Sequence, residues 1–313
     1  MLITNQSVPI ISVIVATRNR KAVLGNFLEA LRRLPSRPTW ELIVVDNGST
    51  DGTDQLLLSA SKELPIVCIC ERLPGKSRSL NRGLAVAKGE FLLFTDDDVV
   101  PESQWLVALY DASLAFPDAN VFGGKIVINP ERIPSWIANS YNLKTMLASE
   151  QDLGDSVRRF GDGQYPIGPN LAIRRRILEQ KSLCWPVNFG PGTKIPLGDE
   201  RAFLMPISPP HFRDRLYVPH CVVLHSIGGR PLSVRNAVIR CFLGGFSAGL
   251  VDRRYRSFRP RQYRRAWNFA MDRLRQSSSF WELMCMVSRA LGVIAGTLSP
   301  YPPVVHDPGG QKH

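Results

Sequence analysis

The stretch NRGLAVAKGEFLLFTDDDVVP, residues 81–101, passes from a helical pattern through the apolar run FLLF into three consecutive aspartates, Asp96, Asp97 and Asp98. Like charges repel, and aspartate is a poor strand residue, so a bound cation is the simplest explanation of this triplet at a strand end. Mg²⁺ and Mn²⁺ prefer oxygen ligands and bridge carboxylates to the phosphates of a substrate. The alternative is a solvated acidic turn that begins the next helix.

Before this stretch, the same order of short apolar strand and helical segment recurs. Apolar runs at 11–16, 41–46 and 65–70 are each followed by a turn and by apolar residues at helical spacing. With FLLF, these predict an α/β fold in which a mostly parallel sheet is flanked by helices. Such sheets bind ligands at the carboxyl ends of their strands. Besides the aspartates, the polar residues at these ends are Thr17, Arg18, Asn19, Asp46 and Asn47.

After residue 120 the pattern loosens. VFGGKIVIN at 121–129 predicts a strand, and 130–165 has no clear period and predicts long loops on the acceptor side. PIGPNLAIRRRIL at 166–178 predicts a turn followed by a helix, and PLGDERAFLMPI predicts another helical turn. YVPHCVVLHSIG predicts a late strand that ends near His225.

From Leu232 onward, helical periodicity takes over. We therefore expect one large domain at 1–230 and a basic, helical C-terminal region at 231–313. Within the domain, we expect a nucleotide-binding half at about 10–125 and an acceptor half at 126–230.

Composition narrows the class of protein. The chain has 313 residues, 44% of them hydrophobic, which is enough for a large core. Its six cysteines include no Cys-x-x-Cys pair, which indicates a reducing compartment, and we expect a cytoplasmic location. The first residues do not read as a secretion signal. The apolar stretch LMCMVSRALGVIAGTL contains Arg289 and is shorter than a bilayer span, so we expect no spanning helix.

The formal net charge is +12, and RRYRSFRPRQYRRAW at 253–267 is rich in arginine and aromatic residues. Such a run suits a nucleic acid or an anionic bilayer, although a solvated basic helix face gives the same pattern. Because apolar segments adjoin it, we expect 251–313 to contact the inner face of a cell membrane. Nucleic acid is the weaker expectation, since the acidic triplet would have no use there.

Asp46 ends an apolar strand within VVDNGSTDGT. Acidic residues in this position accept hydrogen bonds from a ribose or a base in nucleotide-binding folds, but an Asx-turn explains the residue equally well. The chain contains neither GxGxxG nor GxxxxGK[ST], so dinucleotide-binding and P-loop proteins lose their main support.

Taken together, five segments resemble glycosyltransferase family 2, whose members are inverting enzymes of the GT-A (nucleotide-diphospho-sugar transferase) fold. The segments are SVIVATRNR, VVDNGSTDGT, NRGLAVAKGEFLLFTDDDVVP, PIGPNLAIRR and LGDERAF, and the resemblance covers roughly residues 10–230. It implies a nucleotide-sugar donor, a UDP-sugar in most members, and a hydroxyl acceptor that is often lipid-linked. It also implies a divalent metal, Mn²⁺ or Mg²⁺, on the donor diphosphate.

The resemblance assigns roles to individual positions. Thr17 and Asp46 match positions that contact the donor nucleotide, together with Asn19 in the loop after the first strand, and Arg78 lies where a basic side chain meets the donor. Asp96 and Asp98 match the outer positions of the DxD motif, so Asp98 is the main expected metal ligand and Asp96 a ribose or metal contact. Asp97, between them, is a spacer or a donor contact.

Inversion requires a base that deprotonates the acceptor hydroxyl. The family supplies it from an acidic pair in the order Glu-Asp, whereas this chain has Asp199 and Glu200 in reversed order. Column matching favours Glu200 as the base, residue type favours Asp199, and a carboxylate that stabilises the start of a helix is a structural alternative for both.

Two further residues complete the expected site. Asn170 resembles the asparagine of a Gly-x-Asn turn near the donor sugar or the acceptor, although it can also be a plain turn residue. His225 lies after the late strand, where some GT-A enzymes place a metal-binding histidine, but a lone histidine is more often structural.

The expected function is therefore metal-dependent, inverting sugar transfer from a nucleotide-sugar to a hydroxyl acceptor in polysaccharide, glycolipid or glycoconjugate synthesis. Two alternatives stay open at this point. A nucleotidyltransferase on a similar sheet needs a glycine-rich basic loop after the first strand, where this chain has TRNRK. A non-catalytic protein that binds nucleic acid or membrane would leave the aspartates without a function.

Overall fold

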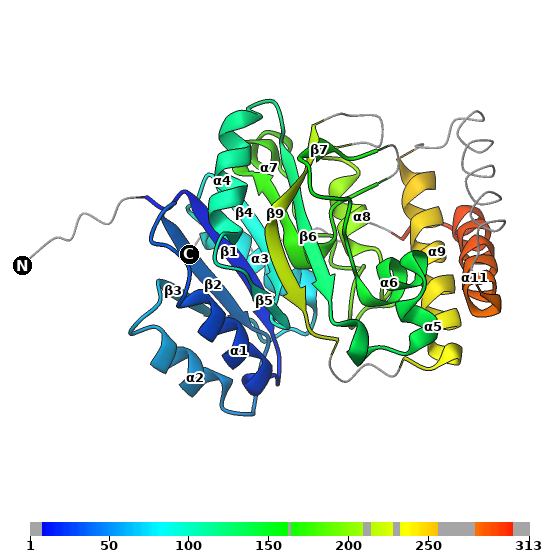
Figure 1. The fold of residues 1–313 in the computed structure, drawn as a ribbon, viewed down its shortest axis with the longest axis horizontal. Coiled ribbons are helices and arrows are strands. Elements are labelled where there is room, and N and C mark those ends of the chain that lie inside the picture. The colour runs from blue at the N-terminus through cyan, green and yellow to red at the C-terminus, as the bar shows by residue number, and fades with distance from the viewer. Residues whose placement is uncertain (1–7, 162–163, 209–213, 228–231, 256–278, 303–313) are drawn as a thin grey trace, which may run out of the picture.

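A computed structural model describes residues 8–161, 164–208, 214–227, 232–255 and 279–302. A nine-stranded sheet lies at its centre with helices on both sides (Figure 1). The strand order is β3-β2-β1-β4-β8-β6-β9-β5, and β7 pairs with β9. The expected α/β architecture with C-terminal helices is confirmed.

The first half of the sheet is parallel, as the sequence predicts. β1 pairs in parallel with β2 and β4, and β2 pairs in parallel with β3. Its strands are β1 (Ile11–Thr17), β2 (Trp40–Asp46), β3 (Ile66–Cys70) and β4 (Phe91–Asp96), and its helices are α1 (Lys21–Leu31), α2 (Thr53–Ala60) and α3 (Lys76–Val86).

The second half mixes strand directions. β6 runs parallel to β9, whereas β4 with β8, β6 with β8, β5 with β9 and β7 with β9 are antiparallel. The strands are β5 (Val99–Pro101), β6 (Val121–Ile128), β7 (Arg158–Arg159), β8 (Leu171–Arg174) and β9 (Arg215–His225). The helices are α4 (Trp105–Ala115), η1 (Pro130–Arg132), α5 (Ser135–Ala138), α6 (Tyr141–Ala148), η2 (Gly168–Asn170), α7 (Arg175–Lys181) and α8 (Asp199–Leu204).

The expectation of a mostly parallel sheet thus holds for the first half only, and the reason lies in β8. Its four residues are all buried, and it joins β4 to β6 with antiparallel pairing on both sides. The sequence predicts a turn followed by a helix there, and η2 and α7 are both present. The strand between them is missed, because so short a buried run has no period that separates strand from helix.

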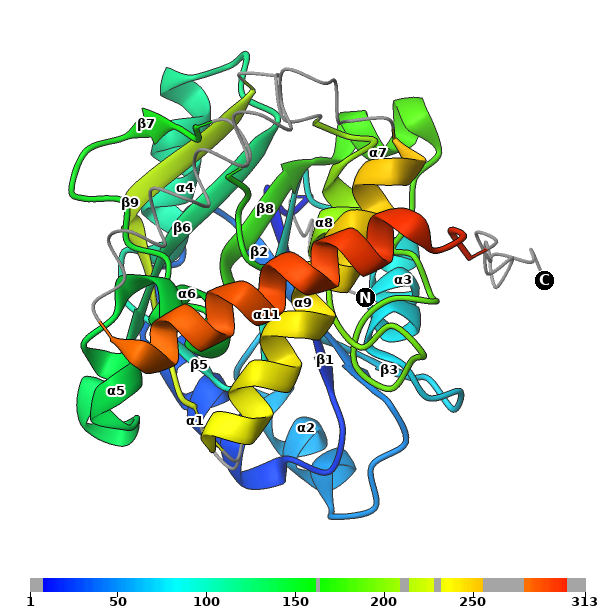
Figure 2. The ribbon, with the colours of Figure 1, turned by 90° about the vertical axis from the view of Figure 1, so that its right-hand side faces the viewer.

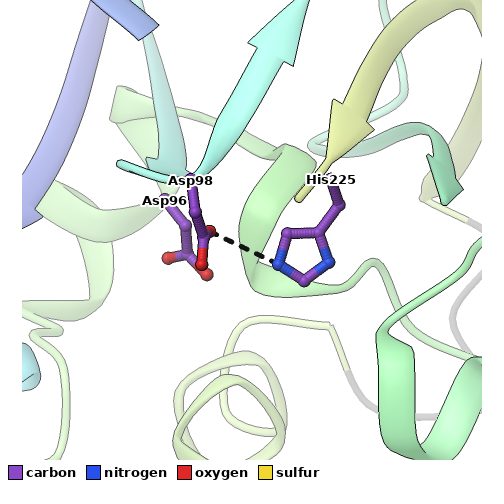
Figure 3. A group of neighbouring side chains, drawn as sticks. All are labelled: Asp96, Asp98 and His225. Atoms are coloured by element: carbon purple, nitrogen blue, oxygen red, sulfur yellow. Dashed lines mark ion pairs between the residues drawn. The ribbon is translucent and has the colours of Figure 1, made fainter. Parts of the chain in front are cut away.

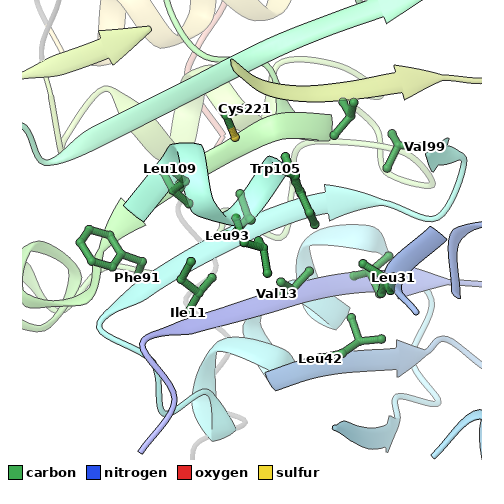
Figure 4. Close-up of a cluster of buried hydrophobic side chains, with 14 of the residues drawn as sticks. Ile11, Val13, Leu31, Leu42, Phe91, Leu93, Val99, Trp105, Leu109 and Cys221 are labelled. Atoms are coloured by element: carbon green, nitrogen blue, oxygen red, sulfur yellow. The ribbon is translucent and has the colours of Figure 1, made fainter. Parts of the chain in front are cut away.

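Alternating residues of the strands pack on opposite faces of the sheet. Val13 and Val15 contact the core beneath α1, α2 and α4, part of which is drawn in Figure 4, whereas Ile14 packs on the other face with residues of α3, α7 and α8. This period of two is that of a strand buried on both faces. Two packed faces hold the strand ends, and so the polar residues on them, in fixed positions.

The C-terminal region contributes α9 (Val234–Arg254) and α11 (Phe280–Leu298). Figure 2 shows α11 crossing α9 as the outermost layer on this side of the molecule. The sequence predicts that the apolar stretch is too short to span a bilayer, and this is wrong on length. By length and composition alone, α9 and α11 are both long and apolar enough to cross a membrane. Most of the basic run, including Arg256, Arg259, Arg261, Arg264 and Arg265, lies outside the described residues.

Candidate active site

The carboxyl ends of three parallel strands form one polar edge. The register aligns Thr17 of β1 with Asp46 of β2, and Ala16 of β1 with Asp96 of β4. A helix N-terminus follows β1 and β2 through a loop, whereas β4 leads into β5 before α4 begins. The strand ends that the sequence predicts to converge therefore lie side by side.

Asp96, Asp98 and His225 form a group of potential metal ligands at this edge (Figure 3). One ligand atom from each lies within 4.8 Å of the others. Strand pairing brings the histidine there, because His225 at the end of β9 pairs with Val99 of β5, the residue after Asp98. The Asp98 Oδ1 and His225 Nε2 atoms are 3.3 Å apart, and both residues are buried.

The hydrogen bonding of His225 determines which ring nitrogen faces Asp98. Its Nδ1 lies 2.9 Å from the backbone oxygen of Ala148, which can only accept, so Nδ1 carries a proton. Nε2 then faces Asp98 Oδ1, and among the described residues neither of these buried atoms has a hydrogen-bond partner. A proton on Nε2 or a cation held between the two atoms would satisfy both. Two carboxylates and an imidazole suit Mn²⁺ better than Mg²⁺, which prefers oxygen ligands.

Arg20 fixes the orientation of two aspartates. Its guanidinium donates to Asp97 Oδ1 at 2.6 Å and to Asp98 Oδ2 at 2.8 Å. Burial of Asp98 opposes its charge, but contacts with His225 and Arg20 outweigh it and hold the pKa of Asp98 well below its usual range. Burial raises the pKa of Asp97 to about 6, although Arg20 and Thr17 act in the opposite direction. Arg20 therefore keeps Asp98 Oδ1 turned toward His225.

The Thr17 hydroxyl lies within this arrangement. It donates a 2.7 Å hydrogen bond to Asp97 Oδ2, and both side chains are buried. Thr17 and Asp97 thus hold each other across the β1 and β4 ends, so Asp97 has a structural use beyond that of a spacer.

Lys76, at the start of α3, links the metal-ligand group to the expected base. Its Nζ donates to Asp96 Oδ1. Burial disfavours the ammonium, but Asp96, Asp199 and Glu200 outweigh this effect and raise the pKa of Lys76. The lysine is therefore charged and lies between the carboxylates of β4 and those of α8.

Asp199 and Glu200 begin α8, after Gly198 in the left-handed region at φ 86°. Burial, followed by the neighbouring Glu200 carboxylate, raises the pKa of Asp199 well above its usual range despite the charge of Lys76. Asp199 is 4% exposed, whereas Glu200 is half-buried and its carboxylate lies against Gly168. The protonated form of Asp199 is thus favoured by its surroundings, and Glu200 is the more accessible of the two.

The buried side chain of Asn170 makes its hydrogen bonds within the protein. Its Oδ1 accepts from Trp105 Nε1 at 3.0 Å, and its Nδ2 donates to the backbone oxygens of Lys125 and Cys221 at 3.1 and 2.8 Å. The residue is 1% exposed. In this structure Asn170 joins α4, β6 and β9, and the donor or acceptor contact that the sequence predicts stays a prediction.

The remaining predicted residues line the strand loops. Asp46 Oδ1 accepts from the Ser49 backbone at 2.9 Å, three residues on and so one residue beyond the spacing of an Asx-turn, and this bond closes the loop after β2. Asn19, at φ 50°, accepts from the Thr50 backbone at 2.7 Å and so ties the first loop to the second. Arg78 lies in α3, two residues after Lys76.

The sequence does not single out Arg20 or Lys76, and a lone histidine such as His225 is more often structural than a ligand. Arg20 carries a weak signal, because it follows a strand whose end was already expected to bind a ligand. Lys76 follows a Pro-Gly turn that opens a helix, where a basic residue meets anions. The position of His225 depends on the pairing of β5 with β9 and leaves no local signal.

Comparison with known proteins adds a family match. The model for "Glycosyl transferase family 2" matches residues 12–181. The chain is 25% identical over 201 residues to poly(ribitol-phosphate) beta-glucosyltransferase of Bacillus spizizenii. That match covers 62% of this chain and 29% of the relative, so the chain spans less than a third of that relative's length.

Solved structures agree on the fold. Mannosyltransferase PcManGT from Pyrobaculum calidifontis, in complex with GDP-Man and Mn²⁺, superposes with a TM-score of 0.57 at 18% identity, covering 96% of this chain and 78% of that one. The structure of residues 1–349 of S. aureus TarS superposes with a TM-score of 0.56 at 18% identity, covering 92% of this chain and 81% of that one.

Proposed function

Because the chain belongs to glycosyl transferase family 2 and is a glycosyltransferase, we propose that it transfers a sugar with inversion from a nucleotide-sugar, a UDP-sugar, to a hydroxyl acceptor. Family membership removes the two alternatives that the sequence alone left open. The observation that carries the detailed proposal is the buried contact between Asp98 Oδ1 and His225 Nε2 beside Asp96. A cation held between these two atoms would satisfy both of them, and the contact lies where a donor diphosphate would reach a parallel sheet.

The donor would bind across the strand ends. Asp46 ends β2 and Asn19 lies in the loop after β1, where we place the ribose or base of the donor, and Arg78 of α3 is the proposed basic contact to the donor. Lys76 holds Asp96 and contributes a positive charge that favours a departing diphosphate. We assign residues 10–125 to donor binding and 126–230 to acceptor binding.

Asp96, Asp98 and His225 would hold a divalent metal, Mn²⁺ by preference, and the metal would neutralise the charge that develops on the leaving diphosphate. Arg20 orients Asp98 for this role through its 2.8 Å hydrogen bond to Oδ2, which leaves Oδ1 directed into the site. Arg20 and Asp97 therefore act as positioning residues.

Glu200 is the proposed base. Displacement at the anomeric carbon forms a bond to the acceptor oxygen, breaks the bond to the diphosphate oxygen, and passes the acceptor proton to a carboxylate. Asp199 is buried, and its raised pKa favours the protonated form, which cannot take the acceptor proton. Glu200 is accessible and matches the column of the family's base.

A thermal-shift panel tests the donor assignment. UDP-, GDP- and dTDP-sugars are each added with Mn²⁺, because selective stabilisation reports binding to the folded state. We expect a rise in Tm with a UDP-sugar that is lost without metal and in the His225→Ala variant. Equal or absent shifts with all three donors would contradict the proposal, and a shift with GDP-sugars alone would change the donor.

We also propose a cytoplasmic location with contact of 251–313 at the inner face of a cell membrane, and a lipid-linked acceptor. The exposed basic residues Arg253 and Arg254 at the end of α9 support the membrane contact. The acceptor half faces the same side of the molecule as α9, because α8 packs on that helix through the Arg201 and Asp252 ion pair.

A further inference from the structure

The outward face of α11 is entirely apolar. Every exposed side chain from Phe280 through Leu298 is hydrophobic. Exposed fractions of its large residues run from 37% to 77%, and these residues are Phe280, Trp281, Leu283, Met284, Val287, Leu291, Ile294 and Leu298. Isolated exposed apolar residues are common, but a contiguous face along five helical turns indicates a binding surface.

The polar residues of α11 point the other way. Glu282 is 3% exposed and accepts a 2.6 Å hydrogen bond from Asn142 of α6. Ser288 donates to the Val238 backbone oxygen of α9 at 2.8 Å, and the Arg289 guanidinium lies against Gly244. A helix at the surface of a water-soluble protein buries its apolar stripe and exposes its charges. In α11 this polarity is inverted.

Close backbone packing fixes α11 in this orientation. A Cβ on Gly245 would lie 2.0 Å from the Arg289 oxygen, and one on Gly292 would lie 2.1 Å from the Phe242 oxygen. Gly249 and Gly296, four residues further along each helix, make equally close approaches. Small residues at this spacing, with a hydroxyl bonded across the helices, are the packing mode of helices in membranes. The apolar face is therefore presented by a firmly held helix.

The two ends of the face carry interfacial residues. Trp281 lies at the beginning, and Tyr255 and Tyr301 lie near the end. Arg253 donates to the carbonyl oxygens of Thr297, Leu298 and Ser299, and Arg254 stacks over Tyr301 at 5.5 Å. Aromatic rings and arginines beside an apolar stretch are typical of the boundary between lipid tails and headgroups.

We propose that the outer face of α11 binds an anionic lipid bilayer, with the helix lying in the plane of the interface and Arg253 and Arg254 in the headgroups. The helix would cover about 28 Å of interface. A second copy is the less favourable occupant, because it brings the same net charge of +12 and the same arginines to the contact. The inference rests on the membrane contact proposed above and deepens it by naming the face of α11 that makes the contact, and it does not depend on the metal or the base.

The fold connects this face to the candidate base. Gly198, which precedes α8, lies against Ser247 of α9, and Arg201 of α8 pairs with Asp252 of α9. α8 is thus held by the same helix that holds α11. A lipid-linked hydroxyl at the interface would approach Glu200 from this side, which is the acceptor class that the placement favours.

Flotation of the full chain with vesicles tests the proposal. Phosphatidylglycerol and phosphatidylcholine vesicles are compared for the wild type, for Leu291→Glu/Ile294→Glu, and for the matched control Leu58→Glu/Leu114→Glu. The control residues are 69% and 63% exposed on α2 and α4. We expect the wild type and the control to float with phosphatidylglycerol, and partition of the α11 variant to fall by at least about tenfold, because two apolar insertions are lost.

Three outcomes would overturn the proposal. These are a wild type that stays unbound with both vesicle types, an α11 variant that binds like the control, and a wild-type dimer in sedimentation that Leu291→Glu/Ile294→Glu separates into monomers. Equal Tm values for the two double variants exclude unfolding as the cause of lost binding. Asp98→Ala should float like the wild type, so failure of the catalytic proposal is distinguished from failure of lipid binding.

Discussion

At the acidic edge of the sheet, Asp96, Asp97 and Asp98 meet Arg20 and the strand ends, so charge gathers where a ligand would bind. Along α11, the charged side chains Glu282 and Arg289 turn toward the protein and apolar side chains face outward. Charge defines the binding surface in the first region, whereas its absence defines the surface in the second. The two regions therefore suit partners of opposite chemistry, an anionic donor with its metal and an apolar membrane.

An ion pair between α8 and α9 helps to join the two regions. Arg201 of α8 pairs with the buried Asp252 of α9, and Arg289 of α11 lies near enough to lower the pKa of Asp252, although burial dominates and raises it. Substitutions at the acidic edge of the sheet should lower the rate of sugar transfer and leave the free energy of unfolding unchanged. Substitutions between α9 and α11 should lower the free energy of unfolding and leave the rate unchanged. Substitutions in the ion pair between Arg201 and Asp252 should lower both.

Asp98→Ala should have the largest effect. Removal of the carboxylate leaves His225 Nε2 without its partner and removes a ligand for the cation, so we expect kcat/KM to fall by about a thousandfold. Transfer from a radiolabelled sugar nucleotide across a Mn²⁺ titration measures it. Asp54→Ala, an exposed aspartate on α2, is the matched control. Wild-type rates for Asp98→Ala with metal present would refute the assignment.

Glu200→Gln should have the second largest effect. We expect kcat to fall roughly a hundredfold, because a general base contributes at least that much to the rate. Asp199→Asn should lose much less, since an amide resembles the protonated carboxyl that the raised pKa of Asp199 implies. Single-turnover kinetics separates the proton-transfer step from donor binding. If Asp199→Asn is the more damaging variant, the base is Asp199.

Arg201→Gln should weaken both regions moderately. It leaves Asp252 buried without its nearest cation, and we expect the free energy of unfolding to fall by about 2 kcal/mol, less than for an isolated buried charge because Arg289 remains nearby. kcat should fall while KM for the donor is unchanged, because α8 shifts and the donor site does not. Arg201→Gln/Asp252→Asn should recover part of the stability, and a loss that is merely additive would argue against the link.

Gly245→Ala should have the smallest effect and should spare catalysis. A Cβ 2.0 Å from a backbone oxygen forces α9 and α11 apart, and the strain, partly offset by the better helix propensity of alanine, should cost about 1 kcal/mol or more. Gly25→Ala in α1, whose nearest neighbour would be 4.0 Å away, is the matched control and should be neutral or stabilising. Denaturant unfolding compares the two variants, and equal midpoints would mean that the helix pair is loosely packed.

The sequence predicts much of the first half of the fold. Strand and helix periods place β1 to β4 and α1 to α3 to within a few residues, and the end of β9 is also predicted. Prediction fails at β8, where four buried residues carry no period, and for the length of α11, which begins at Phe280. The four-residue spacing of Gly245 with Gly249 and of Gly292 with Gly296 is a signal of close helix packing that the sequence does carry.

The sequence by itself determined the family, the sheet edge and the acidic triplet, because these depend on local patterns: a strand end, a turn and neighbouring charges. Tertiary structure alone decided that His225 meets Asp98, that Arg20 and Lys76 hold the aspartates, and that Asn170 is enclosed in the sheet. It also decided that α11 turns its charges inward. These outcomes depend on pairing between segments far apart in the chain, and the free energy of such contacts is set by burial and geometry that no local pattern records.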